Sequence, residues 1–333
     1  MQKTQGFVFV KFVRYLLNAR ISRFLLQKCD YLFILRPTLF FPVWTVFAAG
    51  YFICERNQTQ IDVSKAFHSM PLIAGIAMTL MMGSAFIINQ ITDRDIDKEN
   101  NKLFILADGY IALWKARIEA ILLAGFSIFV AFGINLALGT FFVLTFLLTG
   151  ILYSCRPFMW KDKALLGILA NGLGAILIFS AGWCSGGPIS LQGFLHAVPY
   201  GLAVSAVYLL TTLLDAKGDA HFGKLTFAVK YKKNKTLVAG TLFSFLTLGC
   251  ALYLDDPLIL YSALFSAPLF TIAVIRQQRQ DIQRAIKFPI LILALTICVL
   301  WPPFFVIIIS TFYCAKLYYR QRFNINYPSF EAD

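Results

Sequence analysis

The stretch PLIAGIAMTLMMGSAFIINQITDRDIDKENNK, residues 71–102, passes directly from an apolar run into a cluster of charges. Residues 71–88 contain no Asp, Glu, Lys or Arg, and a run of this length is about what a helix needs to cross the hydrocarbon core of a bilayer. Three aspartates and a glutamate then follow within residues 89–99. The stretch predicts a membrane-spanning helix with an acidic end, and that end needs a physical reason.

The whole chain is far more apolar than a soluble domain. It has 333 residues, 59% of them hydrophobic, and a mean hydropathy of +0.70, against about 45–50% apolar residues in a typical soluble protein. We expect an all-α membrane protein with a single transmembrane domain over 31–318, a basic amphipathic surface helix within 1–30 and a short polar tail over 319–333. The nine runs long enough to span lie at about 34–54, 71–91, 118–136, 138–155, 164–185, 193–214, 236–254, 257–275 and 287–314.

The connections between some of these runs are short. Only ALGT (137–140) separates the third run from the fourth, and only DDP (255–257) separates the seventh from the eighth. Both connections predict tight hairpins. The ninth run contains Trp301-Pro302-Pro303, and because proline cannot donate a helical hydrogen bond, this pair predicts a kink.

The distribution of positive charge predicts how the chain crosses the membrane. With the N-terminus in the cytoplasm, 25 of the 30 Lys and Arg residues fall in cytoplasmic segments, in agreement with the positive-inside rule. Lys316, Arg320 and Arg322 are three of the five exceptions. We therefore interpret the net charge of +13 as this bias, together with contact with anionic membrane lipids. We expect no nucleic acid as partner. We expect an integral protein of the cell (plasma or inner) membrane.

The acidic end of the opening stretch has a partner elsewhere in the chain. Asn89, Asp93 and Asp97 are spaced i, i+4, i+8, which places them on one face of a helix. Asp215 and Asp219 repeat the i, i+4 spacing at the end of the sixth run, which the topology places on the same side of the membrane. Two such acidic faces would repel unless cations lay between them. The scattered cysteines and histidines show no metal-ligand spacing, whereas carboxylate oxygens suit Mg²⁺, which shares its ligand shell with phosphates.

Basic residues complete this arrangement. Arg36, Lys161 and Lys224 each lie at the cytoplasmic end of a predicted span. In such a site the carboxylates would bind the metal, and the metal would bind phosphate. The basic side chains would neutralise the remaining phosphate charge, so the residues together are consistent with a diphosphate site. The surrounding apolar helices would hold a lipid tail.

Five spaced motifs resemble those of the UbiA-type intramembrane prenyltransferases. The acidic patterns are N-x-x-x-D-x-x-x-D at the end of the second span and D-x-x-x-D at the end of the sixth. LRPTLFFP (35–42) opens the first span as the family's R-P element does. YSCRPFMWK (153–161) is similar to its Y-S-x-x-P-x-x-x-K loop, and GDAHFGKLTFAV (218–229) to its G-D-x-x-x-G-K-x-T segment. The likeness extends over most of the chain.

The resemblance implies a ring of about nine helices around a central cavity, and transfer of an isoprenyl group from a prenyl diphosphate to a lipophilic, membrane-associated acceptor. It also implies a Mg²⁺ cofactor and an active site on the cytoplasmic side. The implied metal ligands are Asn89, Asp93, Asp97, Asp215 and Asp219, and the four aspartates are the implied catalytic residues. The implied diphosphate contacts are Asn89, Arg36, Tyr153, Lys161 and Lys224.

Two positions depart from the family pattern and leave the acceptor open. Phe104 stands where the family's usual arginine falls, and Thr212 where many relatives have a further acid. The Asn89-Gln90 start of the first motif favours an aromatic acceptor, a quinone or tocopherol-type precursor. The alternative is geranylgeranyl transfer to a prenylglycerol phosphate in ether-lipid synthesis.

A cation-coupled membrane transporter is the alternative from a different class, since carboxylates inside a membrane often mark ion paths. Transporters usually place such groups near the bilayer midplane, within inverted repeats. Here the acids gather at one membrane face, which favours the enzyme.

Overall fold

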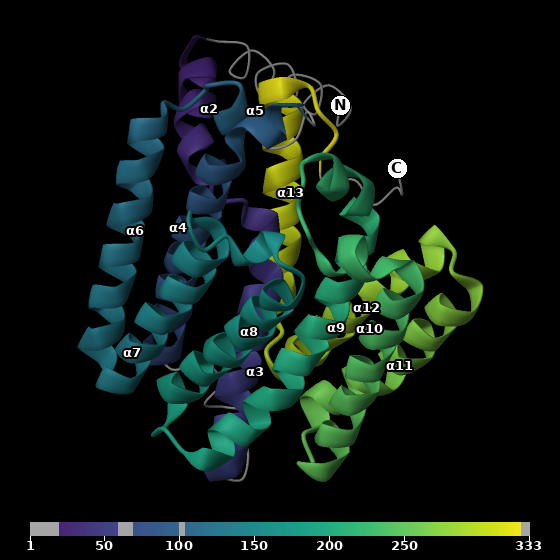
Figure 1. Cartoon of the computed structure of the whole chain (residues 1–333). Helices are drawn as coiled ribbons and strands as arrows, with labels where there is room; N and C mark the ends of the chain where they lie inside the picture. The colour runs from purple at the N-terminus through teal and green to yellow at the C-terminus, as the bar shows by residue number, and fades with distance from the viewer. Residues whose placement is uncertain (1–19, 59–68, 100–103, 328–333) are drawn as a thin grey trace, which may run out of the picture.

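The computed structural model describes residues 20–58, 69–99 and 104–327, and within these ranges every extended regular element is a helix (Figure 1). Eight helical segments are long and apolar enough to cross a membrane, and Leu136–Leu152 is a shorter apolar segment. The predicted all-α membrane protein is therefore confirmed. Residues 1–19, most of the predicted N-terminal surface segment, lie outside the described ranges.

The chain forms its helices in the following order. The N-terminal half contains α2 (Arg20–Phe33), η1 (Pro37–Leu39), α3 (Phe40–Gln58), α4 (Ser69–Glu99), α5 (Phe104–Ala107), α6 (Leu113–Ile134), α7 (Leu136–Thr145) and a π-helical turn, η3 (Phe146–Leu152). The C-terminal half contains η4 (Trp160–Asp162), α8 (Ala164–Gly186), α9 (Leu191–His221), α10 (Phe227–Tyr253), α11 (Pro257–Arg276), α12 (Arg279–Leu300) and α13 (Pro303–Phe323).

Successive long helices pack against one another, and α12 returns to pack against α3 and α9. α8 also packs closely against α3, and two glycines make this approach possible. A Cβ atom on Gly50 would lie 2.0 Å from the Phe179 carbonyl oxygen, and one on Gly182 would lie 1.9 Å from that of Phe47. Small residues let membrane helices approach at this separation. The close α3–α8 pair gives one wall of the cavity described below.

The structure corrects two predicted connections. The turn between α6 and α7 lies at Asn135, before ALGT, because the Asn135 side chain accepts a hydrogen bond from the Leu138 amide and caps α7. The predicted ninth span, 287–314, is wrong as a single kinked helix. The chain leaves the helical conformation at Trp301, where φ is −138° and ψ is 86°, because the residue before a proline avoids the α region. Two helices, α12 and α13, result.

The second of these helices returns to the start of the chain. α13 packs against α2 and η1. Asp30 of α2 is buried and accepts hydrogen bonds from the Tyr318 hydroxyl at 2.6 Å and from Arg322 Nε and Nη2 at 3.0 Å. Arg320 and Arg322 lie in the last turn of α13, and Arg322 borders a pocket with Asp97 and Lys98. Arg320 and Arg322 therefore lie toward the aspartate end of the molecule, which favours a placement on the same side as the acidic motifs.

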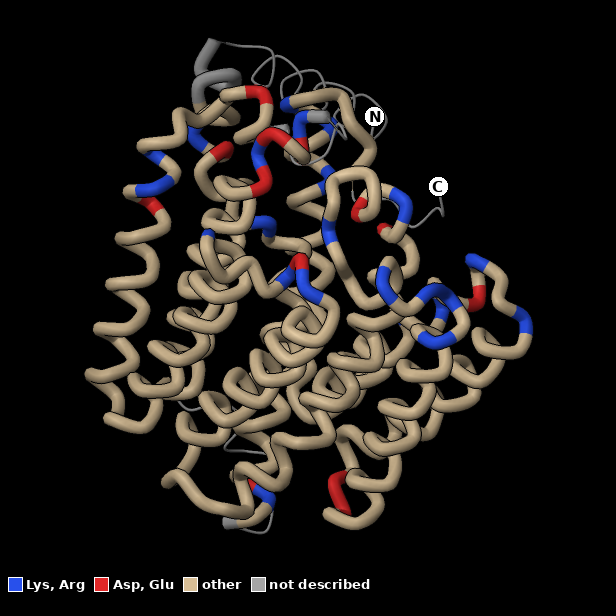
Figure 2. The backbone as a smooth tube through the Cα atoms, viewed as in Figure 1, with Lys and Arg blue, Asp and Glu red and all other residues tan. Residues whose placement is uncertain are grey.

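Charge is distributed unevenly along the molecule. Figure 2 shows Lys and Arg gathered at the end where α2, the end of α4 and the C-terminus of α13 lie, with few charges at the opposite end. At that opposite end, Arg56 in the last turn of α3 pairs with Asp255 of the α10–α11 turn. This asymmetry agrees with the positive-inside rule.

Candidate active site

A cavity of about 580 Å³ lies among α3, α4, α8, α9 and α12. Its wall is polar toward the charged end of the molecule and apolar elsewhere. Eight of the nine predicted site residues line it: Arg36, Asn89, Asp93, Tyr153, Lys161, Asp215, Asp219 and Lys224. The structure thus brings together residues from five separate segments of the chain.

α4 supplies the first acidic motif. At 31 residues it would extend roughly 46 Å, so it runs past the hydrocarbon core and carries Asn89 and Asp93 on its last turns. Asn89 Nδ2 donates to the buried Ser154 hydroxyl at 3.2 Å. Asp93 Oδ2 pairs with Lys161 Nζ at 2.7 Å, and the two side chains are 13% and 7% exposed. The other oxygen, Asp93 Oδ1, is buried and has no hydrogen-bond partner.

Two loops meet beside this pair and bring their charges together. A bridge joins Lys163, just before α8, to Leu225, just before α10, and the Leu225 amide donates to the Asp162 carbonyl oxygen at 2.9 Å. Lys224 Nζ lies 3.7 Å from Asp162 Oδ1. Burial raises the pKa of Asp162, and the ammonium groups of Lys224 and Lys161 oppose that shift. Asp162 also lines the cavity, and the sequence analysis missed it.

α9 supplies the second acidic motif on the opposite wall. Asp215 and Asp219 lie on the last turns of this 31-residue helix. The Thr226 hydroxyl donates to Asp219 Oδ2 at 3.2 Å. Thr212, where many relatives have a further acid, lines the cavity and donates to the Leu209 carbonyl oxygen of its own helix. Its side chain therefore contributes no carboxylate.

Arg36 borders the cavity between α2 and η1 in a conformation unusual for its residue type. Its φ is 57°, in the left-handed region that L side chains rarely adopt. Its Nε is buried and has no hydrogen-bond partner. An unpaired buried guanidinium nitrogen on a cavity wall suits an anionic ligand.

Asp97 is the predicted site residue that the structure does not place on the cavity wall. It borders the adjoining pocket near Lys98 and Arg322, although it remains close enough to Asp93, Arg36 and Lys161 to interact electrostatically with them. One further helical turn beyond Asp93 carries it past the cavity mouth.

Tyrosines form the boundary between the polar and apolar walls. Tyr153 follows the π-helical turn η3 and hydrogen-bonds with Asn171 and Tyr208. The Tyr208 hydroxyl also approaches the Lys161 carbonyl oxygen at 3.5 Å. Asn171 lines the cavity while donating to Gly167 of its own helix. Sequence reasoning missed Tyr208, although it lies two turns before Asp215 on the same helix face, and that spacing could have identified it.

The donor atoms fit a hard cation that is shared with a ligand. Within the described ranges, no group of three or more His, Cys, Asp or Glu side chains is close enough to hold a metal by itself. The partnerless Oδ1 of Asp93 and the carboxylates of α9 across the cavity nevertheless offer oxygen donors from two sides. Mg²⁺ typically takes one or two carboxylates and completes its shell with water and substrate phosphate.

Known proteins are similar to this chain over part of its length. 2-Acylphloroglucinol 4-prenyltransferase of Humulus lupulus is 29% identical over 188 residues, which are 52% of this chain and 45% of that protein. Homogentisate phytyltransferase of Synechocystis sp. is 29% identical over 197 residues, 55% of this chain and 62% of that protein. The chain thus spans about half the length of the curated relatives it matches.

A solved structure shares the fold. A UbiA homologue from Archaeoglobus fulgidus, bound to GPP and Mg²⁺, has a TM-score of 0.66 and 20% sequence identity, over 85% of this chain and 99% of that chain. Residues 42–297, which include all of the cavity lining except Arg36 and Leu39, match the UbiA prenyltransferase family. The resemblance read from the motifs is confirmed, and the chain belongs to the UbiA prenyltransferase family.

Proposed function

We propose that this protein transfers an isoprenyl group from a prenyl diphosphate to a lipophilic, membrane-associated acceptor, with Mg²⁺ as cofactor. One observation carries the proposal: a single cavity joins a cluster of carboxylate and cationic side chains to a long apolar wall. A prenyl diphosphate has the same two parts, a polyanionic head and a hydrocarbon tail.

The polar end of the cavity would bind the head. Arg36 offers a buried guanidinium nitrogen without a partner, and Lys161 and Lys224 line the same cavity. Asp93, Asp215 and Asp219 would hold Mg²⁺, which, when bound, neutralises charge on the diphosphate as the carbon–oxygen bond breaks. Lys161 and Lys224 can stabilise the same charge on the departing diphosphate.

The apolar wall would hold the tail and exclude water. Toward the cavity interior the lining residues include Val43, Val46, Met82, Phe86, Ala175 and Ile178. Loss of diphosphate leaves an allylic cation, which water would capture in an open site. A dry wall therefore favours capture by the acceptor. The Tyr153 and Tyr208 rings stand where the apolar wall meets the charged groups, so an aromatic face is available to the cation.

For the acceptor we propose an aromatic ring, a quinone or tocopherol-type precursor. Two relatives support this choice by name, a 2-acylphloroglucinol prenyltransferase and a homogentisate phytyltransferase. We further propose that the charged end, with the active site, faces the cytoplasm from the cell (plasma or inner) membrane. The concentration of Lys and Arg at that end supports this orientation (Figure 2).

The function is tested with membranes that contain the protein, labelled geranylgeranyl diphosphate, Mg²⁺ and a panel of aromatic and prenylglycerol phosphate acceptors. We expect a labelled prenylated product that is lost on chelation of Mg²⁺. Asp93→Ala and Asp215→Ala should each reduce product formation by at least about a hundredfold, while membrane insertion is unchanged.

Two results would contradict the proposal. Full activity in either aspartate variant would remove the assigned role of the acidic motifs. Cation flux into proteoliposomes, with no binding of any prenyl diphosphate, would favour a transporter instead.

A further inference from the structure

Tyr200 lines the cavity at the end remote from the aspartates. Tyr200 and Asp215 both line the cavity from α9 and are fifteen residues apart, so roughly 22 Å of helix separates them. The deep residues of the other walls, Val46, Met82 and Ile178, lie at the corresponding ends of their helix stretches, away from the charged groups. The cavity therefore runs lengthwise along α9 and ends near Tyr200.

Tyr200 is held in place by contacts on both its ring and its hydroxyl. The side chain is 1% exposed, and its ring packs against Phe179 with the centroids 4.5 Å apart. Its hydroxyl donates to the Asp256 carboxylate, 3.3 Å from each oxygen. Asp256 is fully buried and caps α11 by accepting from the Leu258 and Ile259 amides. A ring fixed at both ends makes a rigid boundary.

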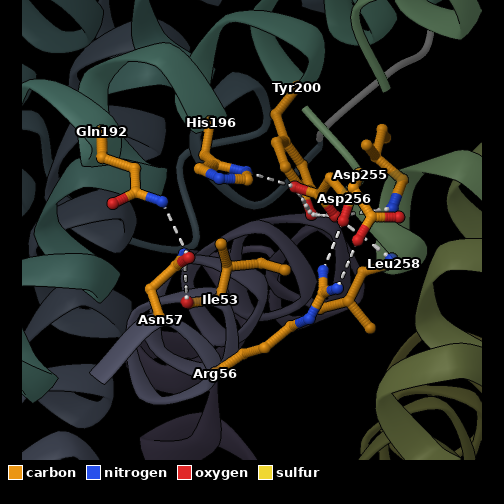
Figure 3. Close-up of polar contacts among 10 residues, drawn as sticks. Ile53, Arg56, Asn57, Gln192, His196, Tyr200, Asp255, Asp256 and Leu258 are labelled. Carbon is orange, nitrogen blue, oxygen red and sulfur yellow. Dashed lines mark hydrogen bonds and ion pairs between the residues drawn. The ribbon is translucent and has the colours of Figure 1, made fainter. Parts of the chain in front are cut away.

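The region behind Tyr200 is filled with polar groups (Figure 3). His196 Nδ1 lies 3.3 Å from Asp256 Oδ2, and His196 is itself buried. Farther toward the end of the molecule, Arg56 pairs with Asp255 at 2.7 Å and Gln192 Nε2 donates to Asn57 at 2.8 Å. These contacts tie α3, α9 and the α10–α11 turn together. A hydrocarbon chain pushed past Tyr200 would have to separate Tyr200 and His196 from Asp256, and leaving these buried polar groups unpaired is costly.

We propose that Tyr200, fixed by Asp256, is the floor of the tail-binding part of the cavity and sets the length of isoprenyl chain that the site accepts best. Units beyond that length gain no further apolar burial inside the cavity. The inference rests on the proposed prenyl-transfer function and adds to it a residue that determines specificity for tail length.

Two substitutions should move the floor in opposite directions. Ala203 lines the cavity one turn from Tyr200, on the side toward the aspartates, so Ala203→Phe should shorten the tail-binding part of the cavity. Tyr200→Ala removes the ring and should lengthen it. Tyr200→Phe keeps the ring and removes only the hydroxyl tie to Asp256. Tyr51→Ala is the matched control, because Tyr51 is also 1% exposed but does not line the cavity.

The measurement is the apparent affinity of the purified protein, with Mg²⁺, for geranyl, farnesyl, geranylgeranyl and longer diphosphates, from the rise in unfolding temperature on titration. Binding of inorganic pyrophosphate, which has no hydrocarbon tail, measures the affinity of the polar end of the cavity alone. In the unmodified protein we expect affinity to rise with length and then level off. Ala203→Phe should weaken binding of the longest tail that fits by about tenfold, since that tail loses the burial of one isoprenyl unit or more, and should leave pyrophosphate binding unchanged.

Tyr200→Ala should move the levelling-off point to a longer tail, whereas Tyr200→Phe and Tyr51→Ala should keep it. An unchanged length profile in Ala203→Phe, with pyrophosphate still bound, would overturn the assignment of the floor even if Tyr200→Ala does not fold. If no prenyl diphosphate binds the unmodified protein at any length, the proposed function itself fails, and that result is distinct from a profile that does not shift.

Discussion

At the scale of single residues, the Asp93–Lys161 pair decides how the polar end of the cavity is held together. Both side chains are largely buried, and they meet at 2.7 Å. Replacing one member of such a pair leaves an uncompensated charge, which costs about 3–5 kcal/mol, whereas replacing both with apolar residues costs much less. We therefore expect Lys161→Met to lower thermal stability sharply and Lys161→Met/Asp93→Leu to recover part of the loss.

This double-mutant cycle is measured as the unfolding temperature in detergent, without Mg²⁺, so that the lysine is the main partner of the carboxylate. Additive losses in the double variant would show that the two charges do not stabilise each other. Lys163→Met is the matched control, since Lys163 is a neighbouring lysine that does not line the cavity.

Part of the site could be predicted from the sequence because single residues within one helix have a fixed spacing. Asn89 and Asp93, and likewise Asp215 and Asp219, share a face because the helical repeat fixes their spacing locally. Asp162 could not be found in this way. It reaches the cavity because the loops before α8 and α10 are joined at Lys163 and Leu225, and such a pairing between distant segments leaves no periodic signal in the sequence.

At the scale of helices, the α3–α8 contact makes a prediction about glycine. A Cβ on Gly182 would lie 1.9 Å from the Phe47 carbonyl oxygen, so Gly182→Ala must push the two backbones apart. Overpacking of this kind costs about 1–3 kcal/mol or more. Gly125→Ala is the matched control, because a Cβ there meets nothing within 4 Å and alanine favours a helix interior.

We expect Gly182→Ala to lower the unfolding temperature and to weaken prenyl diphosphate binding, since α3 and α8 both line the cavity, whereas Gly125→Ala should leave both unchanged or slightly raise stability. Equal stability of the two variants would mean that the α3–α8 approach is not tight.

The limits of helix prediction from sequence have local causes. The runs of apolar residues identified the long helices because hydrocarbon thickness fixes their length. The end of α6 was misplaced because Asn135 acts as a helix cap, which outweighs the turn-forming glycine in ALGT. At Trp301-Pro302-Pro303 the sequence indicated a break, but whether the chain bends or reverses there depends on the packing of α13 against α2 and η1.

At the scale of the whole molecule, the return of α13 changes which charges share a side of the membrane. Arg322 binds Asp30 of α2, and both Arg322 and Gln321 border the pocket that contains Lys98. The C-terminal charges thus join the main group of positive residues, and the positive-inside bias becomes stronger than the sequence alone indicated. The separate helix α13 could not be predicted because the run over 287–314 has no charged residue between its two halves.

This topology is tested with single cysteines introduced into a cysteine-free variant and a membrane-impermeant thiol reagent on sealed vesicles of one orientation. Lys98→Cys and Gln321→Cys lie at exposed positions near the same pocket, and the side chain of Asp255, at the opposite end, is 86% exposed. We expect Lys98→Cys and Gln321→Cys to be labelled from one side and Asp255→Cys only from the other. Labelling after solubilisation confirms that all three thiols are reactive. If Gln321→Cys is instead labelled from the same side as Asp255→Cys, α13 does not return across the membrane. The Asp30–Arg322 pair could not then form in the bilayer, because its two members would lie on opposite sides.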